Sequence, residues 1–157
     1  MPLPDTYSLA KLAHLVAVVL FLGNVTFGLF WVAHAERTSD PRTIGYAMEG
    51  VIRSDRWFTT PFVLLIVIAG FAAAAFGGLR VLRVGWIAWS IGLFTIAGAV
   101  FGMGIAPIQR KIVALARADS PDRAALAAAL KRWHLLGWAS NVPLWIAFAM
   151  MVLKRPL

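Results

Sequence analysis

The sequence predicts an all-α integral membrane protein, an antiparallel up-down four-helix bundle with helical cytoplasmic extensions. The first observation behind this prediction is composition, because 61% of the 157 residues are hydrophobic and only 14% are charged. Soluble domains are typically about 45–50% apolar and about 25% charged. The second observation is that four long stretches, residues 12–35, 57–79, 84–109 and 133–153, contain no Lys, Arg, Asp or Glu.

Each of these stretches is long enough to cross a bilayer as a helix. About 20 helical residues span a hydrocarbon core about 30 Å thick, whereas a spanning strand needs about 9–11 residues that alternate polar with apolar. No such alternation appears in LLIVIAGFAAAAF or LVAVVLFLG. We therefore predict a single transmembrane domain with spanning helices at about residues 10–35, 57–79, 84–108 and 133–153.

The first two connections predict how the spans are arranged. Only residues 80–83 join the second span to the third, so these two helices must be antiparallel neighbours. In the first connection, Asp40 is followed by Pro41. This pair is typical of an N-cap and a first helical residue. We therefore expect a short loop helix at about residues 41–52.

The third connection is predicted to be a helical hairpin. Ser120 followed by Pro121 is again typical of a helix start, here of a loop helix at about residues 121–132. Strong helix formers follow without a break, so this loop helix is expected to run into the fourth span. The third span is likewise expected to continue past Pro107, with the turn near residues 119–120.

The basic residues predict the orientation of the bundle. Ten of the fifteen Lys and Arg residues fall on the side of the first and third connections, and five on the side of the termini. The positive-inside rule then predicts a protein of the bacterial inner membrane with both termini on the side away from the cytoplasm. The net charge of +8 is explained by this topology, so no nucleic-acid partner is expected. Four tryptophans near the predicted span edges are typical of interfacial belts: Trp31, Trp57, Trp86 and Trp133.

The sequence offers few catalytic groups. It contains no cysteine, which excludes thiolate metal sites and thiol nucleophiles. No charged residue lies within a predicted span, which argues against proton-coupled transport. No G-x-S-x-G or H-E-x-x-H motif is present, so no hydrolase is indicated and no catalytic residue is assigned.

His14 is the main candidate ligand. With a period near 3.5 it shares one seam of the first span with small and polar residues that permit close helix packing. An inward histidine in a helix bundle is the usual axial ligand of haem, whereas the alternative is a structural hydrogen bond to a neighbouring helix. The seam consists of His14, Ala17, Phe21, Asn24, Gly28 and Trp31.

Other polar and sulfur-bearing side chains give weaker candidates. His34 and His134 are predicted at one membrane level, where they could share a metal or haem. Met150 and Met151 are weak candidates for a second haem ligand near the depth of His14, although methionine there more often only packs. The polar residues Asn24 and Asn141 are interpreted as interhelical hydrogen-bond formers.

Several segments together resemble a known family. They are KLAHLVAVVLFLG, SDRWFTTP, APIQRKIVALA and the closing MMVLKRP. In this order they resemble a bacterial family of predicted integral membrane proteins of unknown function. A looser similarity runs to the copper-resistance CopD-like proteins and the HemJ-type protoporphyrinogen oxidases, because Lys11, His14 and His34 match the HemJ-type first helix. This resemblance implies a haem-b-binding bundle with His14 as axial ligand.

The HemJ-type pattern is incomplete in this chain. HemJ-type proteins carry an arginine toward the end of the first helix, where this chain has residues 28–31, GLFW. They also carry a functional lysine in a later span, and none of the predicted spans contains one. Protoporphyrinogen oxidation therefore does not follow from the resemblance.

Two function classes stay open at this point. The first is a haem-b redox protein, and the second is a non-catalytic scaffold, assembly factor or complex subunit. The scaffold hypothesis expects a protein partner, including a second copy of the chain, at the cytoplasmic loops in addition to the lipid bilayer. The surface expected to dock it is an apolar stripe after Ser120, formed by Ala125, Leu126, Ala129 and Leu130. A small-solute permease ranks last.

Overall fold

The computed structural model describes residues 5–155, and it confirms the predicted fold class. The described residues form helices joined by short turns, without any strand. Four continuous helical segments are long and apolar enough to cross a membrane, namely Thr6–Glu36, Pro41–Phe76, Gly85–Ala116 and Arg123–Leu153.

Two of these four segments are each divided by a π-helical turn. The first and last segments are the single helices α1 (Thr6–Glu36) and α6 (Arg123–Leu153). The second consists of α2 (Pro41–Ser54), the π turn η1 (Asp55–Thr59) and α3 (Thr60–Phe76). The 3-10 turn η2 (Val81–Arg83) leads to the third, which consists of α4 (Gly85–Val100), the π turn η3 (Phe101–Ile105) and α5 (Ala106–Ala116).

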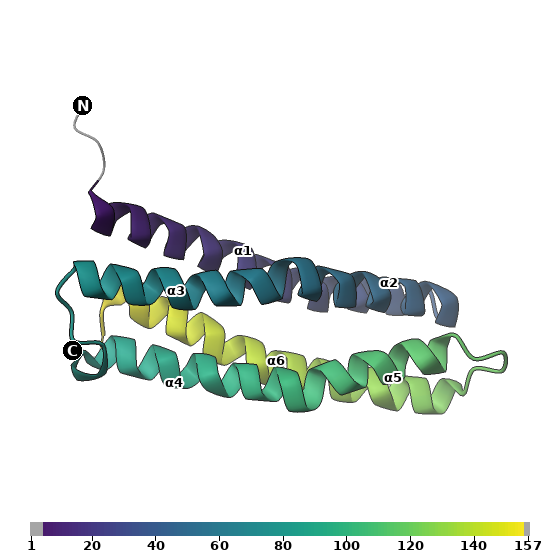
Figure 1. The fold of residues 1–157 in the computed structure, drawn as a ribbon. Helices are drawn as coiled ribbons and strands as arrows, with labels where there is room; N and C mark the ends of the chain where they lie inside the picture. The colour runs from purple at the N-terminus through teal and green to yellow at the C-terminus, as the bar shows by residue number, and fades with distance from the viewer. Residues whose placement is uncertain (1–4, 156–157) are drawn as a thin grey trace.

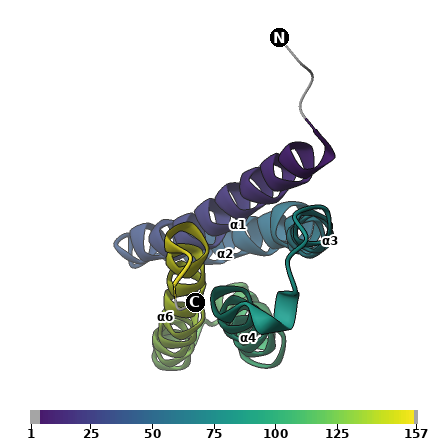
Figure 2. The same cartoon turned by 90° about the vertical axis from the view of Figure 1, so that its left-hand side faces the viewer.

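The bundle is built from two antiparallel helical hairpins. In Figure 1, α1 runs beside α2 and α3, while α6 runs beside α4 and α5. Figure 2 shows the two hairpins as separate layers. The start of α1, the end of α6 and the α3–α4 connection lie at one end, which we call the terminal end. The connections at residues 37–40 and 117–122 lie at the opposite end, which we call the loop end.

The segment after Asp40 differs from the expected separate loop helix. Asp40 does cap α2, accepting hydrogen bonds from the backbone of Arg42 and Thr43 at 3.2 and 3.0 Å. The helix then continues through η1 into α3 instead of stopping near residue 52. Proline lacks an N–H and its ring clashes with the carbonyl four residues earlier. The π turn before Pro61 relieves this conflict without a loop, because Thr60 donates to the Asp55 carbonyl five residues back.

The third connection agrees in outline with the expected helical hairpin. The third helix continues past Pro107, as far as Ala116. A second π turn, η3, precedes Pro107 just as η1 precedes Pro61. The next helix begins at Arg123 with Asp122 as its N-cap, whereas the sequence predicted a start at about residue 121 with Ser120 as the cap. The Asp122 carboxylate accepts a hydrogen bond from the backbone N–H of Ala125 at 2.9 Å, so Asp122 caps this helix instead of Ser120.

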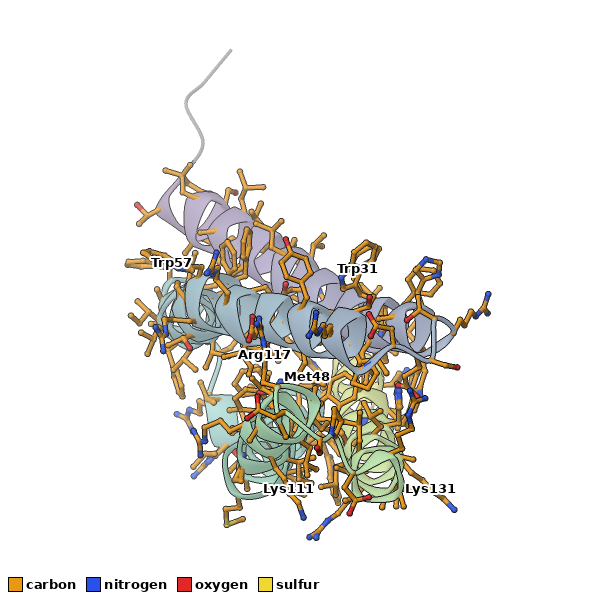
Figure 3. The ribbon with its side chains drawn as sticks, turned by 90° about the vertical axis from the view of Figure 1, so that its right-hand side faces the viewer. Trp31, Met48, Trp57, Lys111, Arg117 and Lys131 are labelled. Atoms are coloured by element: carbon orange, nitrogen blue, oxygen red, sulfur yellow. The ribbon has the colours of Figure 1, made fainter. Side chains whose placement is uncertain are left out.

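The largest hydrophobic core lies toward the loop end. Met48, Ile112 and Val32 are almost completely buried there between the two hairpins. Figure 3 views the bundle from this end, with Met48 between α2 and the opposite hairpin and with Lys111 and Lys131 pointing outward. A smaller core toward the terminal end contains Ala17, Phe21, Leu22, Ile66, Ala97 and Leu144.

This core corrects two sequence-based interpretations. The apolar stripe proposed as a docking surface is internal, since Leu126, Ala129 and Leu130 are all buried in the loop-end core. Trp133 is also buried, so it is not part of an interfacial belt, whereas Trp31 and Trp57 are exposed. Both corrections have one cause: the helical extensions form a bundle of their own and bury the faces that the sequence left unpartnered.

Candidate functional site

A chain of polar side chains crosses the bundle where η1 faces α1 and α5. The Asn24 amide donates to the Thr59 hydroxyl at 3.0 Å, and that hydroxyl donates to Asp55 Oδ1 at 2.8 Å. Gln109 Nε2 donates to the other carboxylate oxygen, Oδ2, at 2.9 Å. The π turn η1 makes these hydrogen bonds possible, because it places Asp55 and Thr59 on the inner side of one helix. The Asp55 carboxylate is thereby held by two neutral donors from different helices.

These residues line a cavity of about 300 Å³ between the two hairpins. Its polar wall contains Asn24, Thr59, Asp55 and Gln109. The remaining wall is largely apolar and aromatic, and both π turns contribute to it. The apolar lining includes Phe21, Val63, Leu64, Phe94, Phe101 and Leu144. The cavity is therefore amphipathic, with a hydrogen-bonding wall and a hydrocarbon-like wall.

One polar atom of the lining has no partner. Trp133 lines the cavity with only 3% of its surface exposed. Its indole Nε1 is buried and makes no hydrogen bond to any residue within 5–155. Buried indole N–H groups usually find an acceptor, and leaving one unsatisfied costs about 1–3 kcal/mol.

The cavity opens sideways between α3 and α4. The connection after Phe76 makes these two helices antiparallel, as predicted, but the prediction that they pack as neighbours was wrong: α3 packs on α1 and α4 packs on α6. Thr60 and Leu64 on α3 and Gly98 on α4 line the cavity and are also exposed. One side of the cavity therefore reaches the outer surface of the bundle.

His14 lies against α3, outside the residues that line this cavity. Its Nδ1 is 2.9 Å from the carbonyl oxygen of Ile66. A carbonyl can only accept, so Nδ1 carries a proton, and in the neutral tautomer Nε2 then has the lone pair. Gly70 provides the space for the ring, since a Cβ there would approach His14 Nδ1 to 2.9 Å. The neighbouring seam residues Ala17 and Phe21 are buried, whereas Trp31 is exposed.

The weaker ligand candidates are placed apart from one another. His134 Nε2 donates to Glu36 Oε1 at 2.5 Å, while His34 is exposed and stacks on Phe30 and Trp31. Met150 and Met151 are half-buried near the end of α6. Within residues 5–155, three or more His, Cys, Asp or Glu side chains do not come together as a metal site. Whether any of these residues binds a metal or haem stays a prediction.

The two asparagines make interhelical hydrogen bonds. Asn24 donates to Thr59, as described above, and Asn141 Nδ2 donates to the Thr26 hydroxyl at 3.2 Å. Trp145 Nε1 donates to the same hydroxyl at 3.3 Å. These bonds join α1 to the second segment and to α6, and they hold the polar wall of the cavity in place.

Comparison with known proteins identifies the family. Residues 8–155 match the family model DUF2269, described as a predicted integral membrane protein. The chain belongs to this family. It is therefore an integral membrane protein in contact with the lipid bilayer, and its four long apolar helices are the candidate spans. Neither the comparison with curated proteins nor the comparison with solved structures gives a match.

Sequence analysis missed the central residues of the cavity in this DUF2269 protein. The second span was predicted to begin at residue 57, after the last charged residue, Arg56. Asp55 precedes Arg56 and was therefore excluded from the span. In the structure it belongs to one continuous helical segment of 36 residues. The signal that points to it is Pro61, because a proline inside an otherwise unbroken helical pattern often accompanies a π turn. Gln109 was treated only as the edge of a span, although just 4% of its surface is exposed in the structure.

Proposed function

We propose that this DUF2269 protein binds a small amphipathic molecule that enters its cavity from the bilayer. The observation that carries this proposal is the amphipathic lining: the Asp55–Gln109 wall shares one space with Phe21, Phe94 and Phe101. Such a site matches a ligand with an apolar body and a polar head.

The size and access of the cavity support this function. A volume of about 300 Å³ lies at the lower end of the range of about 300–1,000 Å³ that is typical of small-molecule sites. It suits a molecule with a short alkyl chain rather than a complete phospholipid. The exposed lining residues Leu64 and Gly98 lie on the apolar helices α3 and α4, which supports entry of the ligand from the bilayer at this side.

The test is binding of tritiated 1-octanol to the protein in phosphatidylcholine nanodiscs, with empty nanodiscs subtracted. A Cβ at Gly98 would meet no atom within 4 Å, so Gly98→Leu fills the cavity without a backbone clash. Gly92 lies on the same helix, has the same open surroundings and does not line the cavity. We expect saturable binding to the unmodified protein and to Gly92→Leu, and at least a tenfold loss in Gly98→Leu. Absence of saturable binding, or equal binding by both variants, would refute the proposal.

Haem binding at His14 is the second candidate function. The observation that favours it is the Ile66 carbonyl, which fixes the proton on Nδ1 and leaves Nε2 available. Histidines that ligate metals usually donate their other ring N–H to such an acceptor. The described residues thus fit one axial ligand, and the resemblance to HemJ-type proteins agrees with this role. Haem b bound there would supply one-electron redox chemistry.

A visible absorption spectrum of the purified protein, expressed with added haem precursor, tests this second function. We expect a Soret band that is lost in His14→Ala and kept in His34→Ala, because the exposed His34 does not share the Ile66 contact. A spectrum without a Soret band excludes haem binding, and a band that survives His14→Ala excludes His14 as its ligand.

The proposal includes an orientation with the loop end in the cytoplasm of a bacterium and both termini outside. It is supported by the ten basic residues of the two loop-end connections and their helical extensions. The chain contains no cysteine, so single cysteines report topology directly. In intact cells, a membrane-impermeant maleimide should label Leu82→Cys and should label Ser120→Cys only after permeabilisation. The reverse pattern would overturn the orientation.

A further inference from the structure

We propose that the head of the bound molecule is a monovalent ammonium group that pairs with Asp55, so that the ligand is a short amphipathic amine. This inference rests on the proposed binding function and adds the chemical class of the ligand. It is carried by the charge balance of the cavity, by the geometry around the carboxylate and by the aromatic lining.

The charge balance is the first argument. Asp55 is part-buried, and its hydrogen-bond partners are the neutral Thr59 and Gln109. Among residues 5–155 the ion pairs are Arg117 with Glu49 and His134 with Glu36, so no Lys, Arg or His lies within 4 Å of the Asp55 carboxylate. The sequence neighbours Arg53 and Arg56 are exposed. A carboxylate removed from water without a counter-charge is strongly destabilised, and a cation in the cavity would compensate it.

The hydrogen-bond geometry is the second argument, and it favours an ammonium over a metal ion. An ionised carboxylate offers about four lone-pair sites, and Thr59 and Gln109 occupy one on each oxygen. The free sites suit the N–H donors of an ammonium group. A Ca²⁺ ion would require about 6–8 oxygen ligands. The groups that flank Asp55 instead direct an O–H and an N–H toward it.

The aromatic lining is the third argument. Phe21, Phe94 and Phe101 line the cavity together with Trp133. Aromatic faces attract cations, by about 2 kcal/mol or more where water is excluded. The apolar remainder of the cavity holds the alkyl chain.

The experiment compares two tritiated probes of equal chain length, octylamine and 1-octanol, by equilibrium dialysis at pH 7 in phosphatidylcholine nanodiscs. We expect octylamine, which is an ammonium ion at this pH, to bind the unmodified protein at least tenfold more tightly than octanol. Asp55→Asn should abolish this preference. Asp119→Asn removes an exposed carboxylate in the loop-end turn, so it should keep the preference and control for general charge effects.

The outcomes separate the two proposals. Equal affinities of the two probes for the unmodified protein would overturn the amine inference without using any variant. A preference that persists in Asp55→Asn would overturn the pairing with Asp55. In both cases saturable octanol binding that is lost in Gly98→Leu would leave the proposed binding function standing. Absence of binding by either probe would refute the binding function itself.

Discussion

The hydrogen bond between Gln109 and Asp55 should be energetically coupled, and a double-mutant cycle measures this coupling. Gln109→Leu removes the donor while keeping a buried side chain of similar size. Asp55→Ala removes the acceptor. The donor–acceptor distance of 2.9 Å lies within the range of charge-assisted hydrogen bonds, about 2.7–2.9 Å. Gln109→Leu by itself should lower the free energy of unfolding, because it takes one of two donors from the Asp55 carboxylate. Asp55→Ala removes that hydrogen bond and also an uncompensated carboxylate, so the coupling energy of the cycle carries the test and not its single effect.

The magnitude follows from two limits. Hydrogen bonds to charged groups contribute about 1.5–3 kcal/mol in proteins generally. Interhelical hydrogen bonds in a membrane protein average about 0.6 kcal/mol and reach about 1.7 kcal/mol. Gln109 is almost fully buried and its acceptor is a carboxylate oxygen, so the bond should fall near the upper membrane value. We expect a coupling energy of about 1–2 kcal/mol.

The assay is reversible unfolding by SDS titration in mixed micelles, followed by far-ultraviolet circular dichroism. The unmodified protein, the two single variants and the double variant complete the cycle. A control cycle pairs Gln109→Leu with Thr26→Val, because Thr26 bonds with Asn141 and shares no partner with Gln109. The control should be additive within about 0.5 kcal/mol. If the Gln109–Asp55 cycle is equally additive, the polar wall does not exist as described.

Three further predictions concern the packing and the helix ends. Leu126→Glu should unfold the loop-end core, with a loss of more than about 3 kcal/mol in the same unfolding assay, because it buries an unpaired charge at a position that is 4% exposed; a stable, fully helical variant would contradict this. Gly137→Ala should destabilise by about 1–3 kcal/mol, since its Cβ would clash with Leu29 Cδ2; unchanged stability would show that Leu29 moves freely. The hydrogen bond from the Thr43 hydroxyl lowers the pKa of the Asp40 carboxylate below 3.8. The stabilisation that the ionised Asp40 cap gives the fold is therefore present above pH 4 and is lost as the pH falls through the lowered pKa. Thermal melts between pH 3 and 6 should show less acid sensitivity for Asp40→Ala than for the unmodified protein, and an identical profile would refute this.

The four spans were predictable because they depend on one strong signal. Long apolar stretches without charges have lipid as their solvent, and their lengths fix their number. The N-cap at Asp40 and the continuation of the third helix past Pro107 were also predictable, since they depend on local chemistry. The exact start of α6 was not, because Ser120 and Asp122 offer competing caps two residues apart.

The cavity could not be predicted from the same signals. The cavity exists because side chains do not completely fill the space between the two hairpins. Local sequence patterns do not indicate where such packing is incomplete. Spans were defined as stretches without charged residues, so Asp55 was placed outside the second span. In the structure the π turn before Pro61 includes Asp55 in a continuous helix. The same rule made Trp133 an interfacial residue, although the loop-end core buries it. Both errors concern the level where the apolar spans meet their polar extensions, and the candidate site lies at that level.

Photolabelling tests the central claim most directly, because it locates a bound amine without relying on any substitution. The probe is an octylamine that carries a diazirine on its alkyl chain, and labelled peptides from the nanodisc protein are mapped by mass spectrometry. The account predicts labelling concentrated on the cavity wall, at Leu64, Phe94 and Phe101, and suppressed by excess unlabelled octylamine. Labels spread over exposed apolar residues such as Ile68 and Leu135, without such competition, would contradict it.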